Sequence, residues 1–360
     1  MSDARYWVAF NRIPHLGTVR FRQLEQHFGT LEQAWSATAG ALKAAGLDSR
    51  AVSEVVSNRD SISPDGEMER LSQASVRAVT WQDEEYPDRL KEIDDPPPVL
   101  YVKGALLPDD WRSIAIVGTR SATSYGKQAA STLARDLVAS GITVVSGLAR
   151  GIDGVAHREV VQAGGRTIAV LASGLDSIYP PEHASLAASI SQQGALVSEH
   201  PLGVKPRSQQ FPRRNRIMSG MTLGTLVIEA GEGSGAVRTV QHALEQGREV
   251  FCVPGSIFSD KSRMTNLLIQ QGAKLVLNHE DILQELNLSS IPQQLALSAV
   301  ADLPEGDEKS ILEHILFEPL HIDEIRGRCQ LPIALVSSTL AMMELKGLVR
   351  QVGGMHYVRS

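Results

Sequence analysis

The chain has 360 residues, 42% of them hydrophobic, and a formal net charge of −6 at pH 7. Its length and apolar content predict about two or three soluble domains, and its acidic balance excludes a protein that covers nucleic acid with its whole surface, while allowing one local basic patch. No apolar run approaches the roughly 20 residues of a membrane helix, the first residues do not resemble a signal peptide, and the two cysteines lie far apart. We therefore expect a cytoplasmic protein with no membrane contact and no disulfide framework.

Residues 1–65 are predicted to form a small all-α domain of the SAM or helix-hairpin-helix kind. Short amphipathic segments are separated there by proline and glycine. The segment "IPHLGTVRFRQLEQHFGT" resembles a helix-hairpin-helix unit, in which a glycine turn before a helix offers backbone N–H groups to a phosphate. Gly17 is the only glycine in a hairpin that usually carries two, so we favour a packing role over a DNA contact.

Residues 66–287 are predicted to form an α/β domain. They begin with a strand in "VRAVTW" and a stiff proline run at residues 96–98. From residue 113 to 277, short apolar runs such as "SIAIV", "ITVV" and "TLVIEA" alternate with amphipathic helices. This alternation is typical of a doubly wound, Rossmann-like parallel sheet covered on both faces. Ligands of such sheets bind at the carboxyl ends of the strands.

A linker is predicted at residues 288–304 and a winged helix at residues 305–360, where three helices precede two strands around a Gly-Gly turn. The expected recognition helix, "LPIALVSSTLAMMELKG", carries almost no basic or amide side chains, whereas base readout needs Arg, Asn or Gln. We therefore favour a protein contact over duplex reading, while Arg350 and Arg359 leave a phosphate contact open.

The first loop of the α/β domain, "GTRSATSYG", joins a strand to a helix. Small residues such as Gly118 and Thr119 let backbone N–H groups approach an anion there, and Arg120 is the expected charged contact. The G-x-G-x-x-G fingerprint is absent. Seven residues separate Gly118 from the Gly126-Lys127 pair, where a Walker loop has four, so ATP hydrolysis loses its main support.

The second loop, "SGLARGIDGVAH", carries Arg150 as a candidate anion contact. Asp153 and His157 follow at an i, i+4 spacing that a metal pair or an acid–base pair would use. No third ligand has suitable spacing. We therefore favour an intrahelical pair that steadies the helix start, and we predict no metal site.

The third loop, "EAGEGSGAVRT", places Ser234 and Gly235 before another helix and also suits an anion. The segment ahead of its strand, "RSQQFPRRNRIMSG", holds four arginines and no acid. Three such loops on one sheet edge favour a polymer with several consecutive phosphates over a mononucleotide. Single-stranded nucleic acid adds bases that stack on aromatic rings, so the candidate contacts of this segment are Phe211, Arg213, Arg214, Asn215 and Arg216.

These loops resemble those of the DprA/Smf family of DNA-processing proteins. The segments "GTRSATSYG", "SGLARGIDGVAH", "LASGLDSIYPPEH", "FPRRNRIMSG", "EAGEGSGA" and "EQGREVFCVPGSIF" occur in family order over residues 113–277. The resemblance implies a non-enzymatic homodimer without a cofactor that binds and protects incoming single-stranded DNA in natural transformation. It also implies loading of the RecA recombinase in place of single-strand binding protein, with DNA contacts at Gly118, Thr119, Arg120, Phe211, Arg213, Arg214 and Asn215. The loop geometry adds Arg150, Arg216, Ser234 and Gly235 to these candidates.

Three positions depart from the family pattern. Arg238 adds a charge near the third loop, in a run that is usually small and then aliphatic. Met264 stands where glycine is common, and Pro181 stands where some members carry a lysine after Tyr-Pro.

The alternative hypothesis is a nucleotide-binding protein or a phosphoribohydrolase-type enzyme of the lysine-decarboxylase-like Rossmann group. Such enzymes place a glycine-rich loop and a catalytic glutamate beside a phosphate-binding arginine. No glutamate follows Ser234-Gly235 where that chemistry would need it. We interpret Glu229 and Glu232, which precede that pair, as structural residues.

Overall fold

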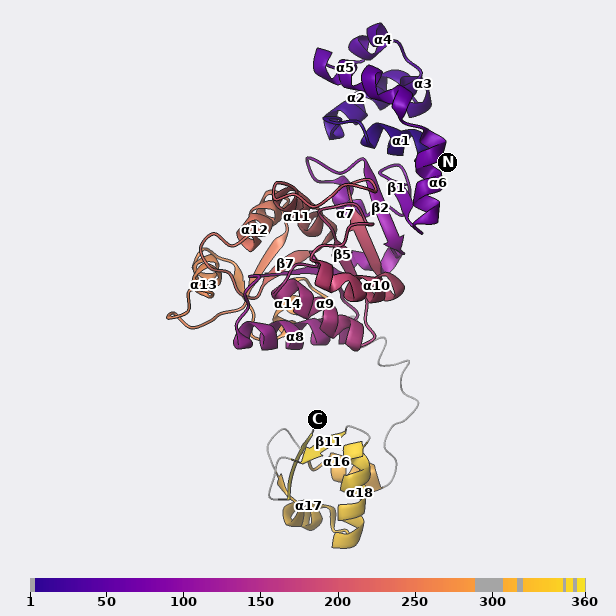
Figure 1. The fold of residues 1–360 in the computed structure, drawn as a ribbon. Helices are drawn as coiled ribbons and strands as arrows, with labels where there is room; N and C mark the ends of the chain where they lie inside the picture. The colour runs from indigo at the N-terminus through magenta and orange to yellow at the C-terminus, as the bar shows by residue number, and fades with distance from the viewer. Residues whose placement is uncertain (1–3, 289–306, 316–319, 346–347, 352–354, 360) are drawn as a thin grey trace. The chain divides into compact units, whose positions relative to one another are not determined.

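The computed structural model describes residues 4–288, 307–315, 320–345, 348–351 and 355–359 (Figure 1). The chain divides into two compact units, Met1–Leu288 and Ser289–Ser360. Apart from its first residue, the predicted linker at 288–304 lies outside the described residues. None of the helices in the described ranges has the length and apolar content that crossing a lipid bilayer requires.

The N-terminal part of the first unit is helical, as its sequence pattern predicts. Its helices are α1 (Ala4–Asn11), α2 (Thr18–Phe28), α3 (Leu31–Trp35), α4 (Ala39–Ala44), α5 (Ser49–Asn58) and α6 (Pro64–Gln73). Four of these helices begin after a side chain that accepts a hydrogen bond from a backbone N–H, which satisfies a donor that the helix leaves free. These N-cap residues are Thr30, Thr38, Asp48 and Ser63.

The N-terminal helices share a hydrophobic core with the sheet of the same unit. Trp7 and Phe21 are buried in one cluster with Tyr101 and Leu196, which belong to sheet strands. The hydroxyl of Thr18, at the start of α2, lies 2.5 Å from a carboxylate oxygen of Asp95. The hydroxyl of Thr18 also donates to the carbonyl of Pro96 at 2.8 Å, so the start of α2 is bound to the segment before β2, which favours the packing role.

A nine-stranded sheet organises the rest of this unit, in the order β1-β2-β6-β5-β4-β3-β7-β8-β9. The strands are β1 (Arg77–Thr80), β2 (Val99–Gly104), β3 (Ser113–Val117), β4 (Thr143–Ser146), β5 (Thr167–Val170), β6 (Ala195–Ser198), β7 (Gly224–Val227), β8 (Glu249–Cys252) and β9 (Lys274–Leu275). Neighbours among β3 to β9 pair in parallel, whereas β2 runs antiparallel to β1 and β6. The sequence pattern did not predict β2, because the proline run directly before it was interpreted as a spacer.

Helices cover both faces of this sheet (Figure 1). The helices that follow the N-terminal part are α7 (Asp88–Lys91), α8 (Ser124–Ala139), α9 (Ile152–Gln162), α10 (Ala184–Gln193), α11 (Gln210–Met221), α12 (Ala236–Glu245), α13 (Arg263–Gln270) and α14 (His279–Glu285). Helix α9 contacts α8 and α10 on one face, and α11 contacts α7 and α12 on the other. Strands β3 to β7 are buried along their whole length, as expected of a doubly wound sheet.

The order of the strands places the loops that matter for function. The chain runs from β3 to β6 toward one edge of the sheet and then returns to β7 on the other side of β3. Doubly wound sheets bind ligands where the strand order reverses. The loops after β3 and β7 flank that point, and their glycines correspond to the predicted first and third loops.

The second unit is a winged helix, as predicted. It contains α16 (Asp307–Leu312), β10 (Leu320–His321), α17 (Ile322–Cys329), α18 (Ile333–Leu345), β11 (Val349–Gln351) and β12 (His356–Arg359). The strands form a sheet in the order β10-β12-β11, of which β10 was not predicted. Ile311, Ile325, Val336 and Leu340 are fully buried in a core of its own.

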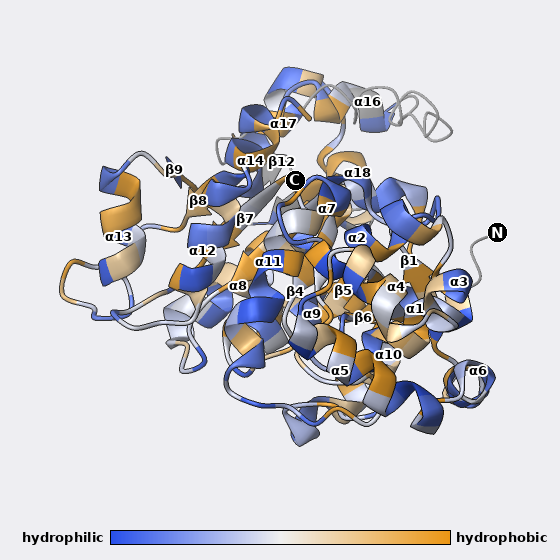
Figure 2. Ribbon diagram, turned by 90° about the horizontal axis from the view of Figure 1, so that it is seen from above, coloured by the Kyte–Doolittle hydropathy of each residue, from blue (hydrophilic) through white to orange (hydrophobic). Residues whose placement is uncertain are grey.

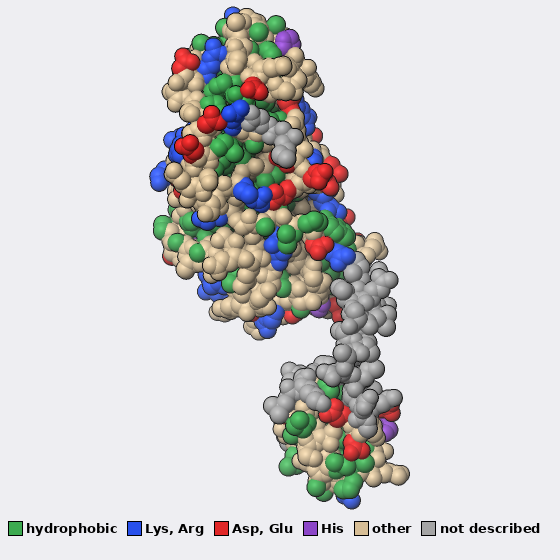
Figure 3. Space-filling model, turned by 90° about the vertical axis from the view of Figure 1, so that its right-hand side faces the viewer, with side chains coloured by type: hydrophobic (Ala, Val, Ile, Leu, Met, Phe, Trp, Pro, Cys, Tyr) green, Lys and Arg blue, Asp and Glu red, His purple; other side chains and the backbone are tan. Residues whose placement is uncertain are grey.

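The surface charges agree with the modest net charge of the chain. Hydrophobic residues gather in the strands, whereas the helices carry both polar and apolar residues (Figure 2). On the face drawn in Figure 3, acidic and basic side chains of the described residues are interspersed. The described residues on that face therefore form no broad basic surface.

Candidate functional site

A groove of about 500 Å³ lies at the carboxyl edge of the sheet, between the first loop, helix α11 and the third loop. We call it the central groove. Its lining includes the predicted site residues Gly118, Thr119, Arg120, Phe211, Arg214, Asn215, Ser234 and Gly235. The predicted residues Arg150, Arg213 and Arg216 are not part of this lining.

Buried Glu229 holds the first loop against the third. Its carboxylate accepts hydrogen bonds from the backbone N–H (2.9 Å) and hydroxyl (2.5 Å) of Thr123, and its carbonyl accepts from the N–H of Thr119 (2.8 Å). A Cβ at Gly126 would lie 2.1 Å from this carboxylate, so only glycine fits there. The structure thus gives Glu229 the structural role expected from the sequence.

The second loop is fixed by Asp153 in a way that the sequence did not predict. Its carboxylate accepts from the backbone N–H groups of Gly147 (3.1 Å) and Ala149 (3.4 Å), while His157 Nδ1 lies 2.8 Å from the Thr167 hydroxyl. The expected intrahelical pair of Asp153 and His157 is therefore wrong, since each side chain bonds to another part of the chain. Burial lowers the pKa of His157 to about 3, which keeps the imidazole neutral.

The spacing of Asp153 and His157 also suits a metal pair. In the described part of the chain, no group of three or more His, Cys, Asp or Glu side chains is arranged to hold a metal ion.

The arginine-rich segment forms helix α11, whose arginines occupy very different environments. Arg214 is 3% exposed, and its guanidinium donates to the carbonyl oxygens of Gly147 (2.8 Å) and Val170, at the ends of β4 and β5. Burial lowers the pKa of Arg214 to about 10, and the opposing charge of Asp153 limits the fall. Burial also raises the pKa of Asp153, and the positive charge of Arg214 opposes that rise. Arg214 therefore fastens α11 to the sheet.

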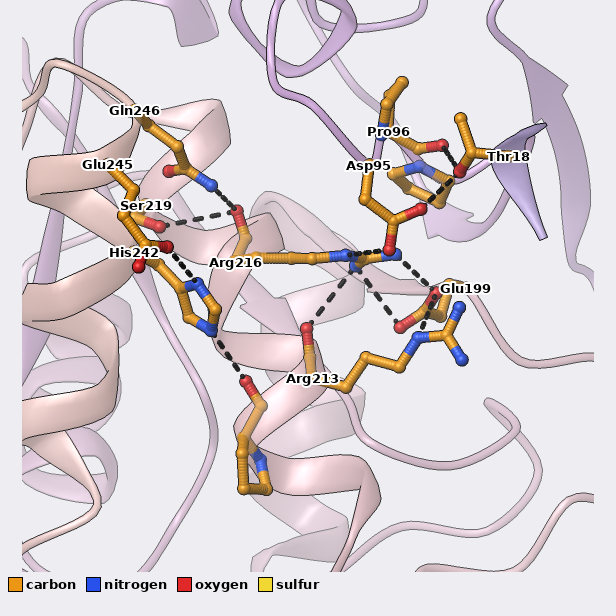
Figure 4. A network of polar contacts seen from close by, with 12 residues as sticks. Thr18, Asp95, Pro96, Glu199, Arg213, Arg216, Ser219, His242, Glu245 and Gln246 are labelled. Carbon is orange, nitrogen blue, oxygen red and sulfur yellow. Dashed lines mark hydrogen bonds and ion pairs between the residues drawn. The ribbon is translucent and has the colours of Figure 1, made fainter. Parts of the chain in front are cut away.

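Arg216 is held by two carboxylates, as Figure 4 shows. Its guanidinium contacts Glu199 at 2.8 Å and Asp95 at 3.2 Å, and both Arg216 and Glu199 are buried. Burial alone would lower the pKa of Arg216, but the carboxylates of Glu199 and Asp95 outweigh it and raise that pKa. Arg216 and the more exposed Arg213 line a second hollow of about 590 Å³, which also contains Asp94.

Arg150 is also engaged elsewhere. Its Nε atom lies 2.5 Å from a carboxylate oxygen of Glu182, and both side chains are about half exposed. The structure thus brings eight of the eleven predicted residues together in the central groove and leaves Arg150, Arg213 and Arg216 outside it.

An aromatic and cationic cluster lies in the central groove. The guanidinium of Arg120 lies over the ring of Phe211, 5.2 Å from its centroid, and the ring of Tyr179 meets Phe211 edge-on at 5.6 Å. Tyr179 was not among the predicted residues. The sequence did offer a signal for Tyr179, since this residue follows the predicted strand β5. Strand β5 adjoins β4, so the loop after β5 lies beside the second loop at the carboxyl edge of the sheet.

Two arginines of the central groove remain available for a ligand. Arg120 and Arg238 line it and are exposed, and among the described residues neither forms a hydrogen bond or ion pair with another side chain. Asn215 connects α11 to the third loop, since its amide nitrogen donates to the carbonyl of Gly235 at 3.3 Å. The groove therefore offers two free cations, an aromatic ring and loops with small residues.

This combination defines the class of the protein: a Rossmann-like binding protein with a groove at its switch point, followed by a winged helix. The chain belongs to the DNA recombination-mediator protein A family, whose model matches residues 77–287, and the model of the DprA winged helix domain matches residues 296–355. The resemblance drawn from the loop sequences is thus confirmed.

Several relatives extend over most of the chain. Protein Smf of Synechocystis sp. is 35% identical over 99% of both chains, and Protein Smf of Escherichia coli is 40% identical over 80% of this chain and 79% of its own. The structure of DprA from Streptococcus pneumoniae, 32% identical, superposes with a TM-score of 0.70 over 79% of this chain and 99% of its own. DprA from Helicobacter pylori, 28% identical and covering 59% of this chain and 96% of its own, superposes with a TM-score of 0.54. That structure concerns its single-stranded DNA binding mode.

The different environments of the arginines predict different effects on stability. Arg216→Ala leaves the carboxylate of Glu199, whose side chain is 8% exposed, without its main partner. Breaking a buried ion pair in this way costs about 3–5 kcal/mol. Arg120→Ala, at an exposed position, changes the free energy of unfolding by less than about 0.5 kcal/mol. Urea denaturation followed by circular dichroism measures both, and equal losses in the two variants would contradict this assignment.

Proposed function

We propose that this protein binds single-stranded DNA in the central groove and catalyses no reaction. The observation that carries the proposal is the cluster of Arg120, Phe211 and Tyr179 in a groove bounded by glycine-containing loops. Aromatic rings stack on the exposed bases of a single strand, and arginines bind its phosphates. In a duplex the bases are stacked on each other and cannot reach such a ring, so the cluster favours single strands.

The geometry gives less support to the alternative enzyme. A phosphoribohydrolase needs a glutamate free to act at the sugar, beside the glycine-rich loop. The carboxylate of Glu229 is buried and bonded to Thr123, and that of Glu232 forms an ion pair with Arg263 at 3.1 Å. Neither residue lines the central groove.

The residues of the central groove divide into contacts and supports. Gly118, Thr119, Ser234 and Gly235 bring backbone close to a phosphate, while Arg120 and Phe211 contact phosphate and base. Arg214 and Asn215 hold α11 in the position that places Phe211 in the groove. Arg213, which is about half exposed, and Arg150 bind phosphates beyond the groove when their acidic partners release them, whereas Arg216 acts only through the position of α11.

The relatives support a role in natural transformation. DprA of H. pylori is described by its single-stranded DNA binding mode, and the matching family is that of a recombination mediator. The protein would then protect incoming single-stranded DNA in the cytoplasm and load RecA onto it in place of single-strand binding protein.

The rate of RecA filament formation on DNA covered by single-strand binding protein tests this role. We expect addition of the protein to accelerate filament formation, and an unchanged rate would contradict the proposal.

The parts of the chain take different tasks in this proposal. The helices of residues 1–65 pack on the α/β part at 66–287, which holds the DNA, and the winged helix at 305–360 contacts a protein. The exposed residues of α18 support the last point, because they include Ile333 and Met342 and no arginine.

A homodimer is part of the proposal, with its interface at the β9 edge of the sheet. Among the described strands β9 is at the end of the sheet and pairs on one side, and the segment from the loop after β8 to the residues after β9 carries the exposed apolar side chains Ile257, Phe258, Leu267, Leu275 and Leu277. Phe258 and Leu277 are 92% and 74% exposed. An open edge strand with an apolar surround is a site where another chain can pair, and a second copy would cover both features at once.

The DNA-binding proposal predicts a loss of affinity without a loss of fold. Phe211→Ala removes the stacking ring and weakens binding of an oligo-dT by about 1–3 kcal/mol, roughly 5- to 150-fold. Arg120→Ala also lowers the slope of log affinity against log salt by about 0.7, the value for one phosphate contact of a single strand. Fluorescence anisotropy at several salt concentrations measures both effects.

The control for these variants is Arg135→Ala, which removes an exposed arginine of α8 that pairs with Glu159 outside the central groove. Its affinity for oligo-dT stays within about twofold of the original, since long-range charge effects are screened. Full affinity in the Arg120→Ala, Phe211→Ala double variant, or equal affinity of the original protein for single and double strands, would contradict the proposal.

The dimer proposal predicts a change of mass. The double variant Phe258→Glu, Leu277→Glu places charges in the apolar patch, so we expect a monomer of 39.0 kDa where the original chain has twice that mass. Val19→Glu, at an exposed position of α2, is the matched control and leaves the dimer intact. Light scattering measures the masses, and a dimer that survives the double variant would place the interface elsewhere.

A further inference from the structure

A third hollow, of about 480 Å³, adjoins the central groove along the third loop. We call it the side hollow. Its walls come from the loop at residues 233–235, from α12 and from the start of α13, and the two helices lie next to each other in both Figure 1 and Figure 2. Its lining includes Pro212, Val237, Arg238, Gln241 and Met264.

We propose that the side hollow is a further nucleotide subsite, in which Arg238 binds the phosphate that joins it to the central groove. The ligand is the continuation of the same single strand. The inference thus rests on the proposed function and extends it to a second site on this chain.

The two hollows are continuous along the third loop. Pro212, Gly233, Ser234, Gly235 and Arg238 line both of them. An added Cβ at Gly233 or at Gly235 would meet no atom within 4 Å, so the loop between the hollows is low and open. A strand that leaves the central groove can therefore pass over the loop at Gly233 and Gly235, where the space around the backbone is open.

The charges of the side hollow favour a phosphate at Arg238. The other charged residue of its lining is Glu232, which forms an ion pair with Arg263 at 3.1 Å. Arg238 is exposed and, within the described ranges, has no acidic partner. Because Arg263 offsets the charge of Glu232, the positive charge of Arg238 remains for an anion.

The remaining lining suits a nucleoside. Val237, Met264 and Pro212 supply apolar surface against which a base or a sugar can pack. The side-chain amide of Gln241 is exposed and can both donate to and accept from a base edge. Because the amide of Gln241 can donate to or accept from any base edge and the other groups are apolar, we expect a subsite with little sequence preference.

The test measures affinity against oligonucleotide length. Oligo-dT chains of increasing length are titrated into the original protein and into Arg238→Gln, with fluorescence anisotropy as the readout. We expect the smallest loss for the shortest chains that bind, because these fill the central groove, which Arg238 also lines, and leave the side hollow empty. For longer chains, Arg238→Gln binds roughly tenfold more weakly, the effect of one lost charge-assisted contact, and its salt slope falls by about 0.7.

Two further variants make the result specific. Arg238→Lys keeps the charge and restores the salt slope, whereas Met264→Glu introduces an acid into the side hollow and reproduces the length-dependent loss. Arg135→Gln is the control and changes neither quantity. Circular dichroism establishes that each variant is folded before titration.

Three results would overturn the inference. Unchanged affinity of Arg238→Gln at every length would show that no phosphate binds there. An equal loss at every length would assign Arg238 to the central groove alone, and a defect confined to assays with RecA would make it a protein contact. In each of these cases the original protein still binds single-stranded DNA and the proposed function stands, whereas absence of binding by the original protein would remove both.

Discussion

The burial of two guanidinium groups on helix α11 is the constraint on which the rest of the site depends. Arg214 binds carbonyl oxygens at the ends of two central strands, and Arg216 binds the carboxylates of Glu199 and Asp95 (Figure 4). Buried charges are costly unless they are paired in this way. The helix therefore has one position against the sheet, and that position places Phe211 in the central groove.

This arrangement explains how an acidic chain can carry a basic segment without a broad basic surface. The arginines of α11 that look alike in the sequence are divided by the fold: Arg214 and Arg216 are used internally, and Arg213 lies near Glu199. The free cations come instead from the first loop, as Arg120, and from helix α12, as Arg238. Both of these cations line the central groove, at the switch point of the sheet.

The sequence predicted those features that depend on local patterns. Apolar runs and glycine loops located strands β3 to β8 and the three loops, because buried parallel strands must alternate with helices. It did not predict which polar groups are buried: Asp153 and His157 have helical spacing, but their partners lie on other elements. Likewise, the direction in which each arginine of α11 points depends on Glu199, Asp95 and the ends of β4 and β5, which only the tertiary structure brings together.

The most direct test of the central claim is to locate bound DNA on the protein. Oligo-dT carrying 5-iododeoxyuridine is irradiated in complex with the full chain, and the linked peptides are identified by mass spectrometry. A base stacked in the central groove predicts links to the peptides that contain Phe211 or Tyr179, whose rings are 5.6 Å apart. Links found solely in the helices of residues 1–65 or in the winged helix would contradict the account.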